Sequence, residues 1–149
     1  MASASTRTSP GRILIVDDNS LGLLARRSVL EELGHRVATS ATGQDALDLC
    51  GKQRFDIVIT DYKMPKMNGV ELIGKLRKLD GNLCIILISG FVDALGLSEE
   101  NTGADIVLQK SANEVSHLIR SVNRLMRKPP PKKKPGSQSA SKIDKRKSV

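Results

Sequence analysis

Five polar side chains in this 149-residue sequence follow short runs of apolar residues: Asp17, Asp18, Asp61, Ser89 and Lys110. Runs of that length, bounded by charged or turn-forming residues, are typical of buried strands. In an open parallel sheet, ligands bind beyond the carboxyl ends of the strands. The five side chains come from four predicted strands, so we expect them to meet at one edge of the sheet.

The chemistry that such a set favours is phosphoryl transfer assisted by a metal ion. Three neighbouring carboxylates repel one another unless a cation lies among them, and Mg²⁺ suits oxygen ligands while keeping several waters. An aspartate can attack phosphorus and form an aspartyl phosphate. Magnesium, Lys110 and the Ser89 hydroxyl would neutralise the phosphoryl oxygens, and Gly90 would leave room for the donor. A single aspartate after a strand is more often a helix cap or turn residue, so the prediction depends on the combination.

The predicted strands and helices alternate along the chain. Strands are predicted for Arg12–Asp18, Arg36–Ser40, Asp56–Asp61, Cys84–Ser89 and Asp105–Lys110. Helices are predicted from Asn19 or Ser20 to Gly34, over Gly43–Gln53, Val70–Leu79 and Asp93–Thr102 (interrupted by Gly96), and after a cap at Asn113. This alternation predicts right-handed crossovers and a parallel sheet covered on both faces. We therefore expect an α/β fold with a doubly wound, five-stranded, flavodoxin-like sheet in the strand order 2-1-3-4-5.

Apolar residues at helical spacing predict which side of each helix faces the core. Without Trp, and with one Tyr and two Phe, the core must be built mainly from Ile, Leu and Val. The residues predicted to face inward are Leu21, Leu24, Val29, Leu30 and Leu33 in the first helix, Ala46, Leu47 and Cys50 in the second, Leu72, Ile73, Leu76 and Leu79 in the third, and Val115, Leu118, Ile119, Val122, Leu125 and Met126 in the last.

The length and charge distribution favour one domain with two tails. We predict a disordered lead over residues 1–11, a folded domain over 12–128, and a disordered tail over 129–149 that is rich in Pro, Lys and Ser. The net charge is +8, and residues 129–149, with seven basic residues and one acidic residue, carry +6 of it. This tail is either simply solvated or makes weak electrostatic contacts with nucleic acid, an anionic membrane or an acidic partner. It contains no aromatic residue for stacking on bases, which argues against sequence-specific nucleic-acid recognition.

The two cysteines, Cys50 and Cys84, are too few for a disulfide framework or a zinc site, and their apolar surroundings predict buried free thiols. Residues 1–11 lack the apolar core of a secretory signal. No apolar run approaches the roughly 18 residues that a membrane span needs. We therefore expect a cytoplasmic protein.

Four segments of the sequence carry a family resemblance: ILIVDDN (13–19), DIVITDYKMPKMNGVEL (56–72), IILISG (85–90) and GADIVLQK (103–110). With these segments, the chain from about Arg12 to Lys128 resembles the receiver domain of bacterial two-component response regulators. The second segment is the most specific, because its aspartate, its Met-Pro pair and its Asn-Gly pair fall at the spacing of that family.

The resemblance implies a role for each residue of the predicted site. Asp17 and Asp18 would bind Mg²⁺ together with Asp61 and the main-chain carbonyl of Lys63. Asp61 would be phosphorylated, Ser89 would move toward the phosphoryl group, and Lys110 would form an ion pair with it. Such a domain receives its phosphoryl group from a histidine kinase or phosphotransfer protein. It catalyses only its own phosphorylation and dephosphorylation, so it is not an enzyme in the usual sense.

Three residues depart from the pattern of the family. Ser111 stands where a proline with a cis peptide bond usually follows the lysine, and Val107 stands where a switch aromatic is common. Lys63 adds a positive side chain near the site, where it would bear on the rate of dephosphorylation. The 21 residues after Lys128 are too few for an effector domain, so the sequence is expected to be a single-domain response regulator with an unidentified downstream protein target.

Three other functions fit parts of the sequence. A flavodoxin-like electron carrier would need a Ser/Thr/Gly-rich phosphate loop after the first strand, where Asp17 and Asp18 lie instead. An aspartate-dependent phosphatase would carry a D-x-D pattern at that place and its nucleophile on the first strand. A receiver that has become a protein-binding scaffold is mildly favoured by Val107 and Ser111 and opposed by the intact acidic residues.

Overall fold

Five short parallel strands form one sheet in the order β2-β1-β3-β4-β5. They span Arg12–Val16 (β1), Arg36–Ser40 (β2), Ile57–Asp61 (β3), Cys84–Ser89 (β4) and Ile106–Gln109 (β5). The computed structural model describes residues 10–127. Both the α/β class and the predicted strand order are confirmed, and each strand lies within two residues of its predicted bounds.

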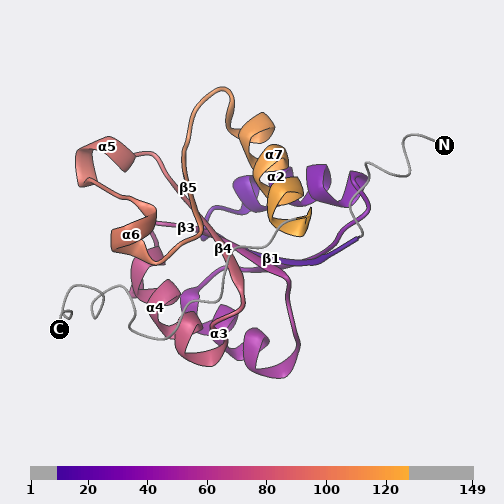
Figure 1. Cartoon of the computed structure of the whole chain (residues 1–149), viewed down its shortest axis with the longest axis horizontal. Coiled ribbons are helices and arrows are strands. Elements are labelled where there is room, and N and C mark those ends of the chain that lie inside the picture. Colours follow the sequence, from indigo (N-terminus) through magenta and orange to yellow (C-terminus); the bar gives the residue numbers. More distant parts are fainter. Residues whose placement is uncertain (1–9, 128–149) are drawn as a thin grey trace, which may run out of the picture.

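Six helices in the described part of the chain cover this sheet on both faces. They are α2 (Ser20–Glu32), α3 (Gly43–Lys52), α4 (Gly69–Leu79), α5 (Val92–Leu95), α6 (Glu99–Thr102) and α7 (Glu114–Arg127). Helices α2 and α7 lie over one face, whereas α3 and α4 lie over the other (Figure 1). The predicted helix over Asp93–Thr102 is two short helices, because Gly96 adopts a left-handed φ of 64° and ends α5.

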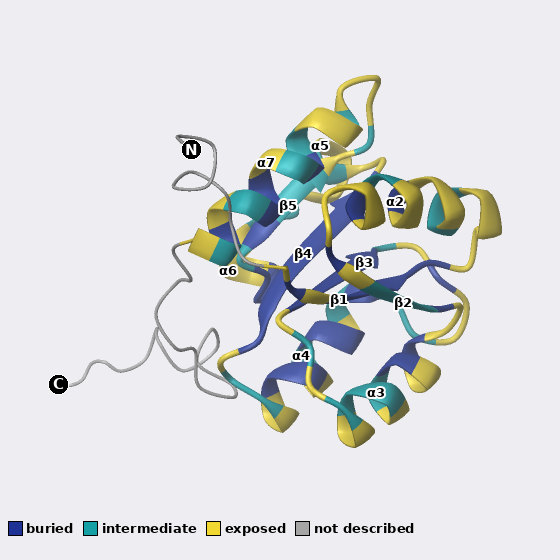
Figure 2. Ribbon diagram, turned by 90° about the vertical axis from the view of Figure 1, so that its right-hand side faces the viewer, coloured by how far each residue is buried: buried dark blue, intermediate teal, exposed yellow. Residues whose placement is uncertain are grey.

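The core consists of two apolar clusters, one on each face of the sheet. Ile13 and Ile15 of β1 join the cluster under α2 and α7, and Leu14 and Val16 join the cluster under α3 and α4. Successive side chains of a strand point to opposite faces, so a strand that is covered on both sides must be apolar throughout. Figure 2 shows the result, with the central strands almost entirely buried.

The predicted inward face of α2 was right for Leu30 but wrong for Leu21, Leu24 and Leu33. Leu21 and Leu24 are 76% and 61% exposed, Leu33 at the end of the helix is also exposed, and Leu30 is fully buried. The inner face instead follows Leu23, Arg26 and Leu30, at the helical spacing of three and four residues. Because a charged residue occupies one turn of that face, the apolar pattern pointed to the wrong side. Leu79 of α4 and Val115 of α7 were also predicted to be buried and are exposed.

The described chain enters the fold at Gly11, at the amino end of the sheet. Gly11, which we had placed in the disordered lead, is buried; its N–H donates to His35 Nδ1 at 2.9 Å, and its carbonyl accepts from the Arg36 N–H. The predictions for residues 1–9 and for the basic tail lie outside the described residues. Within residues 10–127, no helix combines the length and apolar character needed to cross a bilayer.

Both cysteines are free thiols, as predicted, but they differ in burial. Cys84 is buried at the start of β4, and this burial raises the pKa of its thiol to about 11. Cys50 of α3 is only half-buried, which corrects the prediction for this residue. Burial raises its pKa as well.

Candidate functional site

The carboxyl ends of β1, β3, β4 and β5 surround a cleft of about 500 Å³. All five of the residues singled out from the sequence line it, although they come from four separate strands. The lining residues are Asp17, Asp18, Asn19, Asp61, Lys63, Met64, Pro65, Ser89, Gly90, Phe91 and Lys110. A Cβ atom added at Gly90 would meet nothing within 4 Å, in keeping with the open space expected there.

The junction between β1 and α2 positions two of the acids. The Asp17 N–H donates to the Ser40 carbonyl of β2, which extends the parallel pairing past the end of β1. Asn19 caps α2, because its side chain accepts from the Gly22 N–H, and its own N–H donates to Asp17 Oδ1 at 3.0 Å. This turn leaves Asp17 1% exposed, whereas Asp18 is exposed at the mouth of the cleft.

Asp61 is the last residue of β3, and the start of α4 holds it in place. The Gly69 N–H donates to the Tyr62 carbonyl at 2.8 Å, and a Cβ atom at Gly69 would overlap the Asp61 carbonyl oxygen. Asn68 caps α4 through a reciprocal pair of bonds with Glu71. The Asn-Gly pair of the sequence thus combines a helix cap with a close approach of two backbone segments.

Lys110 and Ser89 approach Asp61 from β5 and β4. The Lys110 Nζ atom lies 2.9 Å from Asp61 Oδ1, with the lysine side chain 38% exposed and the aspartate 6% exposed. Ser89 is buried, and its Oγ accepts from the Phe91 N–H at 3.0 Å. The Lys110 N–H also donates to the Ser89 carbonyl, which keeps the two strand ends side by side.

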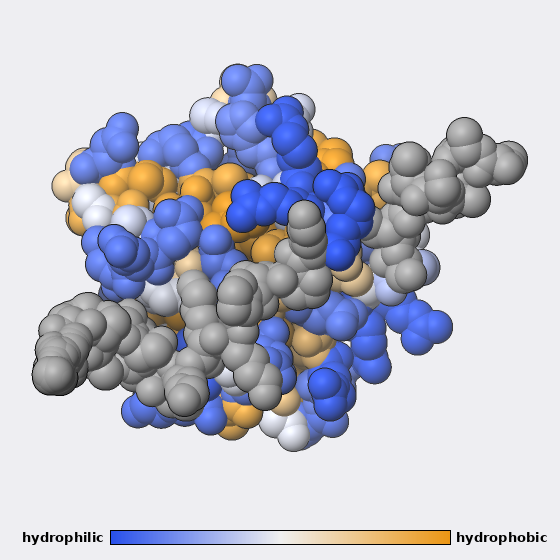
Figure 3. Space-filling view, viewed as in Figure 1, coloured by the Kyte–Doolittle hydropathy of each residue, from blue (hydrophilic) through white to orange (hydrophobic). Residues whose placement is uncertain are grey.

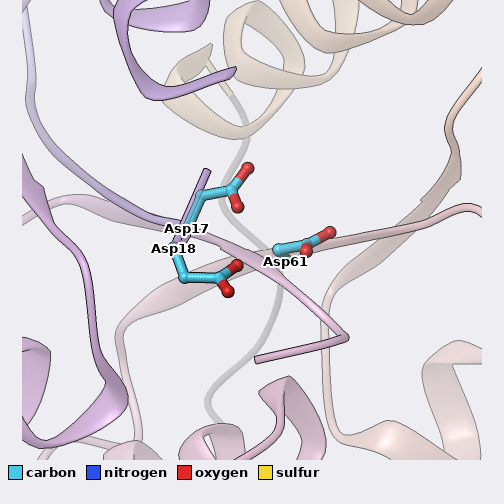
Figure 4. Close-up of side chains that lie close together, drawn as sticks. All are labelled: Asp17, Asp18 and Asp61. Atoms are coloured by element: carbon cyan, nitrogen blue, oxygen red, sulfur yellow. The ribbon is translucent and has the colours of Figure 1, made fainter. Parts of the chain in front are cut away.

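The three aspartates form a compact cluster of oxygen ligands. Each of Asp17, Asp18 and Asp61 offers one carboxylate oxygen, and these atoms lie within 4.8 Å of one another. Figure 4 shows the three carboxyl groups side by side. Burial raises the pKa of Asp61, a rise that Lys110 opposes and that the charge of Asp17 increases.

The donor set fits a hard divalent cation. Mg²⁺ binds oxygen at about 2.0–2.1 Å, so opposite ligands of one ion are about 4.2 Å apart. The aspartate oxygens all lie within 4.8 Å of one another, so the cluster is compact enough to hold a single ion, with waters in its remaining positions. A cation at this point would favour the charged form of Asp61, against burial, which raises its pKa, and against the smaller contribution of the Asp17 charge.

Sequence reasoning missed one contributor to this cluster, the buried Arg26 of α2. Its Nη1 atom lies 2.7 Å from Asp17 Oδ2, and its Nε atom lies 2.7 Å from Glu114 Oε2 at the start of α7. The signal that could have found it is the position of Arg26 in phase with Leu23 and Leu30 on the inner face of the helix.

The residues that depart from the family pattern have defined contacts. Lys63 Nζ lies 5.9 Å from the centre of the Phe91 ring, within the range of a cation–π contact. The Val107 N–H donates to Glu99 Oε2 at 2.9 Å, on the outer side of β5. Ser111 Oγ accepts from the Asn113 N–H, and within residues 10–127 no peptide bond is cis. The role of the Lys63 carbonyl stays a prediction.

Comparison with known proteins identifies the family. The model of the response regulator receiver domain matches residues 13–123. The chain belongs to this receiver family. Its fold agrees with the crystal structure of the response regulator TrrA from Thermotoga maritima in complex with Mg²⁺-BeF, at a TM-score of 0.70 and 31% identity, covering 76% of this chain and 97% of that one. A CheY-like receiver from Methanospirillum hungatei gives a TM-score of 0.71 at 30% identity, covering 82% of this chain and 100% of that one.

Curated relatives place this receiver domain in two-component signalling. Chemotaxis protein CheY of Thermotoga maritima is 30% identical over 116 residues, which are 76% of this chain and 96% of CheY. A response regulator receiver protein of Anaeromyxobacter is 42% identical over 86 residues, and virulence sensor protein BvgS of Bordetella bronchiseptica is 44% identical over 66 residues. These matches cover 56% and 44% of this chain, but only 36% and 5% of the length of those two relatives.

Proposed function

We propose that this receiver domain is a phosphorylation switch in which Asp61 accepts a phosphoryl group in a Mg²⁺-dependent reaction. The observation that carries the proposal is the position of Asp61 between two other acids and Lys110, with its Oδ1 atom 2.9 Å from the lysine Nζ. This arrangement has one carboxylate as nucleophile, further carboxylates for a cation, and a fixed positive charge for the phosphoryl oxygens.

Each residue has one task in the proposed reaction. A carboxylate oxygen of Asp61 attacks phosphorus as the bond from phosphorus to the donor breaks, and the electron pair of that bond leaves with the donor. Lys110 neutralises a phosphoryl oxygen, and the Ser89 hydroxyl turns from the Phe91 N–H to donate to another. Asp17, Asp18 and the Lys63 carbonyl would hold Mg²⁺ with Asp61. The bound ion would supply charge neutralisation on the transferred group.

The proposed phosphoryl donor is a histidine kinase or a phosphotransfer protein. Support comes from the relatives: BvgS is a sensor protein, and sporulation initiation phosphotransferase F of Bacillus subtilis is 32% identical over 80 residues, or 54% of this chain and 64% of that protein. On this proposal the chain catalyses only its own phosphorylation and dephosphorylation, and it acts in the cytoplasm. It passes the signal on through a surface that binds a downstream protein. A contact between the basic tail and nucleic acid stays a prediction.

Incubation with acetyl phosphate tests the proposal directly. With Mg²⁺ present, intact-mass measurement should show one added phosphoryl group, and EDTA should prevent the addition. Asp61→Asn should show no addition because the amide is not a nucleophile. Asp18→Asn, which keeps the nucleophile and removes an exposed candidate ligand, should need a much higher Mg²⁺ concentration.

Three outcomes would point to the rival functions. A folded wild-type protein that never gains mass would favour a binding scaffold without phosphorylation. Sustained release of phosphate from small esters would favour a phosphatase. A yellow preparation with bound flavin would favour the electron carrier, although the two acids after β1 would repel a flavin phosphate.

A further inference from the structure

A buried arginine joins the acidic cluster to the last helix. Arg26 is 6% exposed, and its guanidinium group lies between Asp17, which follows β1, and Glu114, which begins α7. Figure 1 shows α2 and α7 over the same face of the sheet, so the arginine bridges two neighbouring helices as well as the site. Two bonds of 2.7 Å to two carboxylates make this a strong, charge-assisted contact.

The arginine is bonded to the most buried acid of the cluster, Asp17. Asp17 Oδ2 accepts from Arg26, and Asp17 Oδ1 accepts from the Asn19 N–H, so both oxygens of this carboxylate are already bonded. Gly22 makes the contact possible, because a Cβ atom there would lie 3.0 Å from Asp17 Oδ2 and 3.4 Å from Arg26 Nη1. The sequence of α2 thus leaves room for an internal positive charge beside the cluster.

Glu114 is the second carboxylate bonded to the guanidinium group of Arg26. Its carboxylate accepts from Nε of the same guanidinium group, and its side chain is 16% exposed, compared with 2% for Asp17. Burial lowers the pKa of Arg26, but Glu114 and Asp17 together raise it above its ordinary value, so the group stays charged. Because Glu114 holds Nε while Asp17 holds Nη1, the guanidinium group is held toward α7 as well as toward the aspartate cluster.

We propose that Arg26 is a positioning residue that fixes Asp17 and lowers the affinity of the aspartate cluster for divalent metal, and that Glu114 limits this effect by drawing part of the charge toward α7. The inference rests on the proposed metal-dependent function. If the inference holds, the metal affinity depends on the position of α7 relative to α2. The link is the bond between Arg26 and Glu114, which are 88 positions apart in the sequence.

The proposal predicts opposite effects for two substitutions. Arg26→Gln removes the competing cation and should tighten metal binding by roughly tenfold, because a unit charge a few ångströms from an ion contributes at least that much. Glu114→Gln leaves Arg26 to act on Asp17 alone and should weaken metal binding by roughly threefold. A purely structural role would loosen the site in both variants and weaken binding in both.

Matched controls come from the same helix. Arg27 and Glu31 form an exposed pair, with Arg27 Nε 3.1 Å from Glu31 Oε2 and both side chains nearly half exposed. Arg27→Gln and Glu31→Gln repeat the two charge changes without touching Asp17. Manganese titration, with free Mn²⁺ followed by electron paramagnetic resonance and Mg²⁺ as competitor, gives the affinity of every variant. Circular dichroism checks that each variant is folded.

A double-mutant cycle tests whether Glu114 acts through the arginine. In the Arg26→Gln background, Glu114→Gln should change metal affinity no more than Glu31→Gln does. If Glu114→Gln changes the metal affinity by the same factor in both backgrounds, the coupling is overturned. The proposal is also overturned if the metal affinity of either single variant changes in the opposite direction, or no more than that of its control. If Arg26→Gln does not fold, Arg26→Met takes its place because it removes the same charge, and a folded Arg26→Met that binds metal no more tightly than Arg27→Gln overturns the proposal.

The same measurements separate this inference from the function on which it rests. A wild-type protein that binds neither Mn²⁺ nor Mg²⁺ and gains no phosphoryl group overturns both. A wild-type protein that binds metal and is phosphorylated, with Arg26 and Glu114 variants that match their controls, overturns only the role of the arginine.

Discussion

The two ends of the sheet use buried charges differently. At the carboxyl end, Arg26 meets two carboxylates beside an open cleft. At the amino end, Arg77 of α4 is 3% exposed and bonds to Asp105 and to the carbonyls of Gly103 and Leu83. Both arginines are buried and paired, but only the first is bonded to a carboxylate that lines a neighbouring cavity, Asp17.

The contacts of Arg77 explain why its ion pair is not part of a site, although a cavity of about 450 Å³ lies nearby between α3, α4 and the segments before β3 and β4. Its guanidinium group joins α4 to the segments just before β4 and β5, and Asp105 Oδ2 also accepts from the Ile85 N–H at 2.8 Å. Backbone carbonyls take most of the remaining donors of the arginine. The contrast teaches that burial of a charged pair does not mark a site; a site also needs charged groups that face a cleft.

The strongest test of this contrast is Arg77→Met. Removing one partner of a buried pair leaves the Asp105 charge buried without its arginine, so the free energy of unfolding should fall by about 3–5 kcal/mol. Lys78→Met, at the exposed neighbouring position, should change it by less than about 0.5 kcal/mol. Urea denaturation measures both variants. A loss below about 1 kcal/mol, or a changed Mn²⁺ affinity in folded Arg77→Met, would contradict the purely structural role.

A second test compares two glycines of α4. Gly69→Ala should destabilise the protein by about 1–3 kcal/mol and impair phosphorylation, because the new methyl group would overlap the Asp61 carbonyl and the Leu87 side chain. Gly74→Ala should stabilise the protein by about 0.5–1 kcal/mol, since its Cβ meets nothing within 4 Å and alanine favours the helix. Thermal unfolding and acetyl phosphate labelling measure both effects. Equal behaviour of the two variants would show that the approach of α4 to β3 is not tight.

The smallest expected effect is at the amino end, in the pH dependence of stability. Burial lowers the pKa of His35 below its ordinary value of 6.5, against an opposing effect of Asp56, and neutral Nδ1 accepts from the Gly11 N–H. Below about pH 6.5 the unfolded chain takes up a proton that the folded chain refuses, so the stabilisation is present above that pH and is lost as the pH falls.

Replacement of this histidine isolates its contribution. The difference in free energy of unfolding between pH 7.5 and pH 5.5 should shrink by about 1 kcal/mol in His35→Gln, the usual worth of one hydrogen bond. It should persist in His117→Gln, which removes the other histidine of the chain. Urea denaturation at the two pH values decides it, and an unchanged pH dependence in His35→Gln would argue against this contact.

Much of the fold and the candidate site could be predicted because the evidence for them is local. The central strands β1, β3 and β4 are nearly unbroken apolar runs, as burial on both faces requires, and their ends are marked by polar residues such as Asp17, Asp61 or Ser89. Once the strands are parallel, topology alone brings those ends together. The cap at Asn19 and the break at Gly96 follow from the preferences of single residues.

What could not be predicted depends on how distant elements pack. The apolar residues of α2 lie on more than one side of the helix, and only the position of α7 decides that Arg26 faces inward while Leu21 and Leu24 stay exposed. The pairing with Glu114 has no local signature. Apolar side chains also remain at the surface around α5 and β5, where Figure 3 shows hydrophobic atoms and where Phe91 and Leu95 are about half exposed.

The bond between Val107 and Glu99 has a consequence for self-association. Strand β5 is an outer strand of the sheet, and the free N–H groups of such a strand can template the addition of a strand from another molecule. The Glu99 carboxylate already accepts the Val107 N–H, and β5 is only four residues long. An incoming strand would have to displace a charged group to gain a short ladder, so this border of the molecule is protected against edge-to-edge aggregation.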